Sequence, residues 1–228
     1  MAKTKLKKFA EINSFSNVIQ PPSPFDLTHF ELRGKWNESF FGNTSPIVLE
    51  IGCGKGEYTI GLARAYPKVN FIGIDIKGDR IWNGARQALD EGLQNVAFLR
   101  IQAESIANYF DQNEVDGIWL TFPDPQPRKT RQRKRLSSPT FLHRYSLILK
   151  PGAPIHLKTD NADLFAYTLD VINQEKHTLI TAIHDLYGKN VVNETMTRDI
   201  QTYYEKKYLE QGLPIHYLKF CLHEPGKS

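Results

Sequence analysis

The sequence contains little cysteine and no long apolar run, and each scarcity excludes a class of protein. Two cysteines, Cys53 and Cys221, among 228 residues exclude a disulfide framework and favour a reducing compartment. No segment approaches the roughly 20 consecutive apolar residues of a membrane-spanning helix. The N-terminal lysines are not followed by the apolar segment of roughly 7–15 residues that a signal peptide contains. We therefore expect a soluble, cytoplasmic protein with no membrane partner.

Metal ligands and a strong net charge are also missing. The seven histidines show no pairing that is typical of a metal site, so we expect no metal. The formal net charge of +4 is too small to identify a nucleic-acid-binding protein. Positive charge is instead concentrated in two segments, residues 3–8 and 128–135. Because 40% of the residues are hydrophobic, the chain has enough apolar material for a packed core.

From Pro46 onward, short apolar segments alternate with segments of helical period, and this alternation is typical of a mainly parallel α/β sheet. We expect one domain over residues 46–228, with seven strands and helices on both faces of the sheet. The expected strands cover residues 47–51, 69–76, 96–101, 115–122, 154–158, 179–186 and 215–221. The expected helices cover residues 57–66, 79–91, 106–110, 139–149, 161–174 and 200–211.

Residues 1–45 lack a clean period. Lysines come first, prolines follow at positions 21, 22 and 24, and a mixed aromatic segment occupies 25–41. We expect a partly disordered N-terminal arm that orders against the domain or against a ligand. Its lysines can equally serve as a solubilising tail.

A glycine turn follows the first expected strand, at residues 50–56 (EIGCGKG). Glycines at 52, 54 and 56 allow positive φ and a close approach of the backbone to a ligand. A dinucleotide fingerprint would need its third glycine at position 57, where Glu57 stands. Glu50 would also repel a pyrophosphate, whereas it suits the cation S-adenosylmethionine (SAM). The alternative is a tight strand–helix turn that binds no ligand.

Asp75 ends the second strand, where an acid can accept hydrogen bonds from both ribose hydroxyls. This acid-flanked turn is similar to that of the Rossmann-like class I methyltransferases. The resemblance implies that Glu50 lies near the methionine part of SAM and that Asp75 holds its ribose. The loop after the third strand usually sets a polar side chain against the adenine, a role that Gln102 fits. Gln102 can also be an ordinary surface residue.

The most informative stretch runs from residue 118 to residue 135. A buried strand ends at three spaced prolines, and Asp124 is held between Pro123 and Pro125. Six of the eight residues 128–135 are Lys or Arg. In open α/β sheets ligands bind at this edge, so we expect an enzyme that acts on RNA. The plainer alternatives are an aspartate that braces a proline turn and a solvated basic surface.

Phe-Pro-Asp-Pro followed by a Lys/Arg-rich loop resembles the bacterial tRNA (guanine-N7)-methyltransferase family. The similarity extends over most of residues 46–221. The matching motifs, in the same order, lie at residues 50–56, 73–75, 123–125, 159–160 and 202–205. Five ordered motifs are more specific than any one of them alone.

This resemblance implies a class I fold with an antiparallel last strand and transfer of a methyl group from SAM to guanine 46 of the tRNA variable loop. It implies that Asp124 is the catalytic residue. The implied cofactor-binding residues are Glu50, Gly52, Gly54, Gly56, Asp75, Gln102 and Asp124. The implied substrate-binding residues are Arg128, Asp160, Thr202, Tyr203, Tyr204 and Glu205.

Three residues depart from the family pattern. Gln126 replaces the usual Trp, which removes a stacking or packing surface. Arg128 replaces Lys, which keeps the charge but changes its geometry. Gln102 replaces a commoner Asp or Asn. Two alternatives therefore stay open, an RNA-binding protein without turnover and an enzyme that methylates a different RNA guanine. Monomer and homodimer both stay open, and no obligatory protein partner is evident.

The chemistry of guanine defines the role expected of Asp124. N7 carries an unprotonated lone pair, so no base has to remove a proton before attack on the methyl group. The enzyme must align the reacting atoms and stabilise the positive charge that passes to the base. Asp124 is therefore expected to orient the guanine and to stabilise the positive charge that passes to it. Tyr203, Tyr204 and Tyr208 can stack on a displaced base, or they can be core residues at helical spacing.

Overall fold

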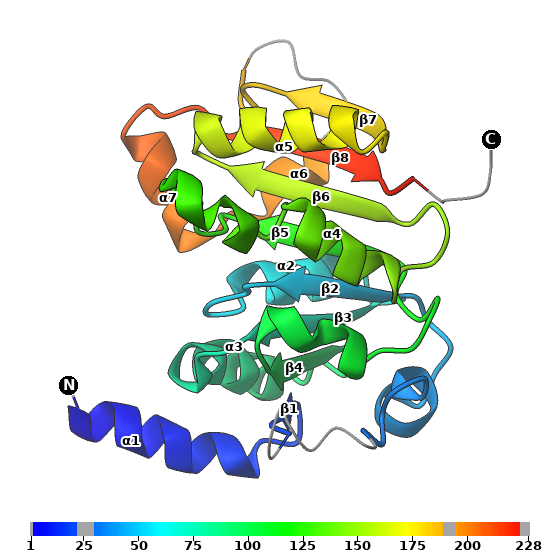
Figure 1. Ribbon diagram of the computed structural model, residues 1–228. Helices are drawn as coiled ribbons and strands as arrows, with labels where there is room; N and C mark the ends of the chain where they lie inside the picture. The colour runs from blue at the N-terminus through cyan, green and yellow to red at the C-terminus, as the bar shows by residue number, and fades with distance from the viewer. Residues whose placement is uncertain (1, 22–29, 189–194, 224–228) are drawn as a thin grey trace.

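An eight-stranded sheet crosses the molecule and carries helices on both faces (Figure 1). The computed structural model describes residues 2–21, 30–188 and 195–223. The strands, in the order β1-β4-β3-β2-β5-β6-β8-β7, are β1 Val18–Ile19, β2 Ile47–Ile51, β3 Asn70–Asp75, β4 Val96–Arg100, β5 Gly117–Thr121, β6 Pro154–Thr159, β7 Thr178–Ile183 and β8 His216–Cys221. The α-helices are α1 Ala2–Glu11, α2 Glu57–Ala65, α3 Gly78–Asp90, α4 Pro139–Ser146, α5 Ala162–Gln174, α6 Thr195–Asp199 and α7 Tyr203–Glu210. None of the described helices is long and apolar enough to cross a membrane.

The sheet is parallel except for β8, which pairs antiparallel with both β6 and β7. The strand order reverses between β2 and β5, which are hydrogen-bonded neighbours. At such a reversal the helices leave the sheet on opposite faces, so a crevice opens at the carboxyl ends of the strands. The expected α/β fold and the antiparallel last strand are confirmed.

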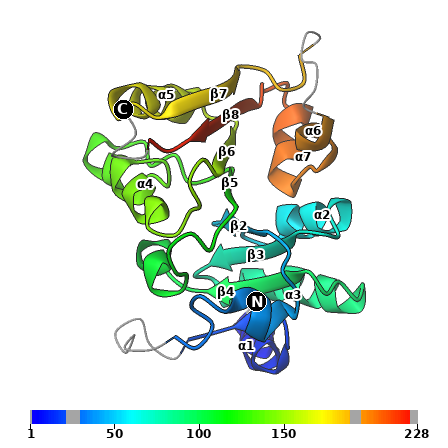
Figure 2. The same cartoon turned by 90° about the vertical axis from the view of Figure 1, so that its right-hand side faces the viewer.

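Two apolar cores, one on each face, hold the helices to the sheet (Figure 2). One joins α4 and α5 to the sheet through residues such as Phe141, Tyr145 and Phe165. The other joins α2 and α3 through residues such as Ile60 and Ile81. Because both faces of β2 to β5 are covered, these strands are nearly continuous apolar runs, which explains why the sequence predicted them.

The described part of the predicted N-terminal arm packs on the domain. α1 lies along α3, where Lys8 Nζ donates to Asn83 at 2.9 Å. β1 pairs with β4 and adds an eighth strand to the seven that the sequence predicted. Trp36 is fully buried in the core, and its indole N–H donates to the Tyr109 carbonyl at 2.9 Å. Residues 22–29, which include two of the arm's prolines, lie outside the described residues, and partial disorder of the arm stays a prediction.

Within the predicted domain, residues 46–228, three short helical segments differ from the sequence-based expectation. The basic loop forms a 3-10 helix, η4 (Lys129–Lys134), and the segment expected at 106–110 is the 3-10 helix η3 (Ala103–Asn108). The third segment is α6, where the polar sequence predicts a loop. A two-residue strand such as β1 and a single helical turn contain too few residues to show a hydrophobic period, so the pattern did not reveal them.

Candidate active site

The glycine turn between β2 and α2 has the conformation that its sequence predicts. Gly52, Gly54 and Gly56 have φ of 79°, 55° and 73°, a region that favours glycine. At Gly56 a Cβ atom would also lie 2.6 Å from the Phe98 ring, so no larger residue fits without displacing that ring. The turn therefore brings bare backbone to the crevice between β2 and β5.

Glu50 lies at the bottom of the crevice and is 3% exposed. Its carboxylate accepts a hydrogen bond from the Thr59 backbone N–H at 2.8 Å and others from the hydroxyls of Thr59 and Thr121. Burial raises the pKa of Glu50 to about 7, although these hydrogen bonds oppose the shift. Glu50 lines a cavity of about 100 Å³. An ionised Glu50 there would attract a ligand cation.

Asp75 lies at the end of β3, where both of its oxygens accept backbone hydrogen bonds. Oδ2 accepts from Gly54 N at 3.0 Å, and Oδ1 accepts from Lys77 N at 2.8 Å. Asp75 and the exposed Gln102 line a second cavity, of about 500 Å³. Gly52 lines both cavities, so they meet at the glycine turn. The two adjoining cavities suit a long ligand that has a cationic group at one end and a ribose nearer the other end. SAM has this shape and this distribution of groups.

Asp124 follows β5 and is exposed. Its Oδ1 accepts a hydrogen bond from the Gln126 backbone N–H at 3.0 Å. Both Phe122 and Gln126 have positive φ, 47° and 44°, which is uncommon for residues other than glycine. Asp124 thus braces its own turn, as the plainer alternative required. It is also exposed, so bracing does not prevent contact with a substrate.

The basic segment, residues 128–135, is not uniform. Arg135 is only 4% exposed, and its Nε donates to the Pro125 carbonyl at 2.8 Å. The other five cations are exposed: Arg128, Lys129, Arg131, Arg133 and Lys134. The predicted contact residue Arg128 is among these accessible groups.

Tyr203 and Tyr204 begin α7 and face the glycine turn. They are 58% and 50% exposed and line the smaller cavity beside Glu50. The Tyr203 backbone N–H donates to Glu57 Oε2 at 2.9 Å, which ties the start of α7 to α2. Thr202 is nearly buried and caps α7 through a hydrogen bond from Glu205 N. The two tyrosines are therefore not core residues and are open to a stacking partner.

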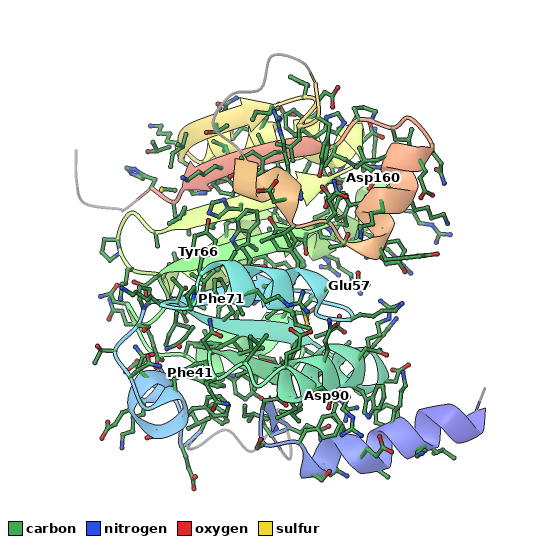
Figure 3. All side chains as sticks on the ribbon, turned by 180° about the vertical axis from the view of Figure 1, so that it is seen from behind. Phe41, Glu57, Tyr66, Phe71, Asp90 and Asp160 are labelled. Carbon is green, nitrogen blue, oxygen red and sulfur yellow. The ribbon has the colours of Figure 1, made fainter. Side chains whose placement is uncertain are left out.

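Asp160 follows β6 and is half-buried, and this burial raises the pKa of its carboxyl group. Figure 3 shows Asp160 beside α7, with Glu57 on the same side of the molecule. Tyr208 lies near Asp160, since burial and then the charge of Asp160 raise the pKa of Tyr208. Tyr208 also packs on Phe122, with ring centroids 5.9 Å apart. Asp160 and the turn after β5 thus flank the same end of α7.

Glu205 is fully buried, which does not support direct contact with a substrate. Its oxygens lie 2.7 and 2.9 Å from Lys158 Nζ, and Oε1 also accepts from the Tyr187 hydroxyl at 2.8 Å. Lys158 Nζ donates to the Thr197 carbonyl at 2.6 Å as well. This ion pair fastens the chain around α6 and α7 to β6. Sequence reasoning missed Lys158, although a lysine at the end of an apolar strand was a visible signal.

No group of three or more His, Cys, Asp and Glu side chains in the described part of the chain could hold a metal ion.

Comparison with known sequences identifies relatives over almost the whole chain. A sequence model of the family described as "Putative methyltransferase" matches residues 44–218. A relative from Christiangramia forsetii, named tRNA (guanine-N(7)-)-methyltransferase, is 53% identical over 221 residues, which are 96% of this chain and 98% of the relative.

Solved structures share the fold. The 16S rRNA methyltransferase KamB gives a TM-score of 0.61 at 15% identity, over 82% of this chain and 92% of that one. A variant of the 16S rRNA (adenine(1408)-N(1))-methyltransferase from Catenulisporales acidiphilia, with its cosubstrate SAM, gives 0.57 at 15% identity, over 88% and 95%. At these identities the likeness concerns the fold, which is that of the class I methyltransferases.

Proposed function

Because this chain belongs to the tRNA (guanine-N(7)-)-methyltransferase family, we propose that it methylates N7 of a guanine in tRNA with SAM as donor. One observation carries the proposal beyond the family. Glu50, Asp75 and Asp124 stand at or beside the carboxyl ends of three adjacent strands, β2, β3 and β5, and an exposed basic segment follows the third.

The residues present fit SAM, which supplies an electrophilic methyl group and leaves as S-adenosylhomocysteine. In the proposal, Glu50 in its ionised form attracts the ammonium group, and the backbone of residues 52–56 allows the ligand to approach closely. Asp75 accepts the ribose hydroxyls, since each of its oxygens accepts one hydrogen bond from the described residues and has a lone pair left. Gln102 contacts the adenine through its amide.

On the substrate side, Asp124 and Asp160 act as hydrogen-bond acceptors for N1–H and the exocyclic amine of guanine. These hydrogens become more acidic as N7 gains positive charge, so the hydrogen bonds strengthen in the transition state. No base is needed, because N7 attacks through a free lone pair. Asp124 therefore acts by orientation and by electrostatic stabilisation.

The exposed basic residues, Arg128 among them, bind tRNA phosphates in this proposal, and Tyr203 and Tyr204 stack on bases near the site. Phosphate contacts give a salt-dependent affinity that does not depend on base sequence. The proposed target is guanine 46 of the variable loop. A cytoplasmic location is part of the proposal, because the proposed substrate is tRNA.

The test is transfer of a labelled methyl group from SAM to unmodified tRNA and to a transcript in which guanine 46 is changed. We expect label on the first and none on the second. Label on both would retain the enzyme and reject the target. If neither is labelled while SAM still raises the melting temperature, the protein binds SAM without methylating tRNA.

A further inference from the structure

Arg135 differs in burial from every other cation of the basic segment. The five exposed cations can reach a phosphate, whereas the side chain of Arg135 turns inward and the residue is 4% exposed. A guanidinium removed from water is costly unless it is well compensated, so its position reflects specific partners.

The partners of Arg135 are the backbone of the turn that carries Asp124. Nε donates to the Pro125 carbonyl at 2.8 Å, and Nη2 lies 3.5 Å from the Gln126 carbonyl. The N–H of Gln126 in turn donates to Asp124 Oδ1 at 3.0 Å. Because the Pro125 carbonyl and the Gln126 N–H belong to the same peptide group, a short chain of hydrogen bonds runs from the buried guanidinium through that group to the proposed catalytic carboxylate.

An aromatic ring supports the guanidinium. Arg135 Cζ lies 4.3 Å from the centroid of the Tyr167 ring, which α5 contributes. In the described part of the chain, Arg135 forms no ion pair with a carboxylate. Carbonyl oxygens and a ring face thus compensate its charge, and the planar fork of arginine suits both at once.

The contacts of Arg135 also explain how the turn can contain Gln126, at a position where the family that the sequence resembles usually has Trp. In the described structure the Gln126 side chain makes no hydrogen bond, whereas its backbone N–H donates to Asp124 and its carbonyl lies beside the Arg135 guanidinium. Because Arg135 and Tyr167 act on the backbone, the turn does not depend on an aromatic side chain at position 126.

We propose that Arg135 is a positioning residue for methyl transfer, which fixes the turn of residues 123–126 and so the orientation of Asp124, and is not a phosphate ligand. This inference rests on the proposed function. The basic segment then has two roles. Its five exposed cations are available to bind RNA, and Arg135 holds the turn that carries the Asp124 carboxylate.

The test compares Arg135→Gln with Arg133→Gln, which removes one charge from the same segment at an exposed position. For each variant, kcat at saturating tRNA and the tRNA Kd at several salt concentrations are measured. Arg135→Gln should lower kcat by about tenfold to 100-fold, because small misplacements of a reacting geometry are costly. It should leave the slope of log Kd against log salt unchanged. Arg133→Gln should weaken tRNA binding and reduce that slope by about 0.7–0.9.

Conservative variants separate positioning from charge. Arg135→Lys keeps the charge without the fork and should lower kcat severalfold; wild-type kcat in this variant would overturn the inference. Tyr167→Phe keeps the ring and should retain kcat, whereas Tyr167→Leu should lower kcat without changing the salt slope. A reduced salt slope in Arg135→Gln together with wild-type kcat would also overturn it.

Two controls keep the result interpretable. SAM should raise the melting temperature of each variant, which shows that the cofactor half is folded; if Arg135→Gln does not fold, Tyr167→Leu decides. Failure of the proposed function is separately visible, because the wild-type protein would then label no tRNA. The salt slope of tRNA binding would still show whether Arg135 contacts a phosphate.

Discussion

In the cofactor half of the site, formed by β2 and β3, uncharged donors hold the carboxylates; these donors are backbone N–H groups and, for Glu50, the hydroxyls of Thr59 and Thr121. Thr59 N donates to Glu50, nine residues away, and Lys77 N donates to Asp75, two residues away. In the substrate half, formed by β5, β6 and α7, buried cations hold the functional segments. Arg135 fixes the turn of Asp124, and Lys158 reaches Glu205, which is 47 residues away.

This difference has an energetic consequence. In the cofactor half several hydrogen bonds stabilise the position of the carboxylates together, each worth about 1.5–3 kcal/mol when the acceptor is charged. In the substrate half one side chain can hold a whole segment, so its loss also leaves a buried partner unpaired. Single substitutions should therefore damage the substrate half more than the cofactor half.

The largest effect is expected from Lys158→Met. It leaves the fully buried carboxylate of Glu205 without its cation, which should cost about 3–5 kcal/mol of unfolding free energy. Urea unfolding measures this loss. The matched control is Lys150→Met, which breaks an ion pair with Asp116 in which the lysine is 47% exposed and should cost less than about 1 kcal/mol. Equal losses of unfolding free energy in the two variants would show that the buried ion pair contributes no more than the exposed one.

Asp124→Asn should reduce kcat by about 100-fold, because it replaces a carboxylate that stabilises charge appearing only in the transition state. The binding of SAM, followed by thermal stabilisation, should remain. Asp170→Asn, an exposed aspartate on α5, is the control and should retain wild-type kcat. Activity within twofold of wild type in Asp124→Asn would reject the proposed role of Asp124.

Asp75→Asn should weaken SAM binding by about tenfold, since one charge-assisted hydrogen bond is worth about 1.5 kcal/mol. The new amide also places an N–H₂ group against the N–H of Gly54 or Lys77, which loosens the glycine turn. Calorimetric titration with SAM gives the affinity. Asp90→Asn, at the far end of α3, should bind like wild type, and an unchanged affinity in Asp75→Asn would place the ribose elsewhere.

The smallest effect concerns the pH dependence of SAM affinity. Burial raises the pKa of Glu50 to about 7, so below that pH the free protein carries a neutral carboxyl group that does not attract the ammonium. Affinity should therefore rise as pH increases, by about eightfold between about pH 6 and pH 7.5 if only the ionised form binds. Glu50→Gln should abolish this rise. A wild-type affinity that is constant over this range would contradict the assigned role of Glu50.

The two halves of the site also differ in how well the sequence predicts them, and the cofactor half is the better predicted one. The glycine turn, Glu50 and Asp75 are recognisable because closely spaced glycines and an acid at the end of an apolar strand are visible in the local sequence. The sequence does not predict whether Tyr203 and Tyr204 are exposed, because a helical spacing of aromatic residues fits both a core and a surface. Their exposure depends on how α7 packs beside α2.

The α/β fold, the order of the main strands along the chain and the acid-flanked glycine turn are predictable from residue order, because hydrophobic period and positive φ are local properties. The burial of individual charged residues is visible only in the folded protein. Glu205, within a substrate motif, pairs with Lys158, and Arg135, within a basic run, turns toward Pro125 and Tyr167. Burial depends on which distant segments pack against a residue, and residue type and spacing alone do not contain that information.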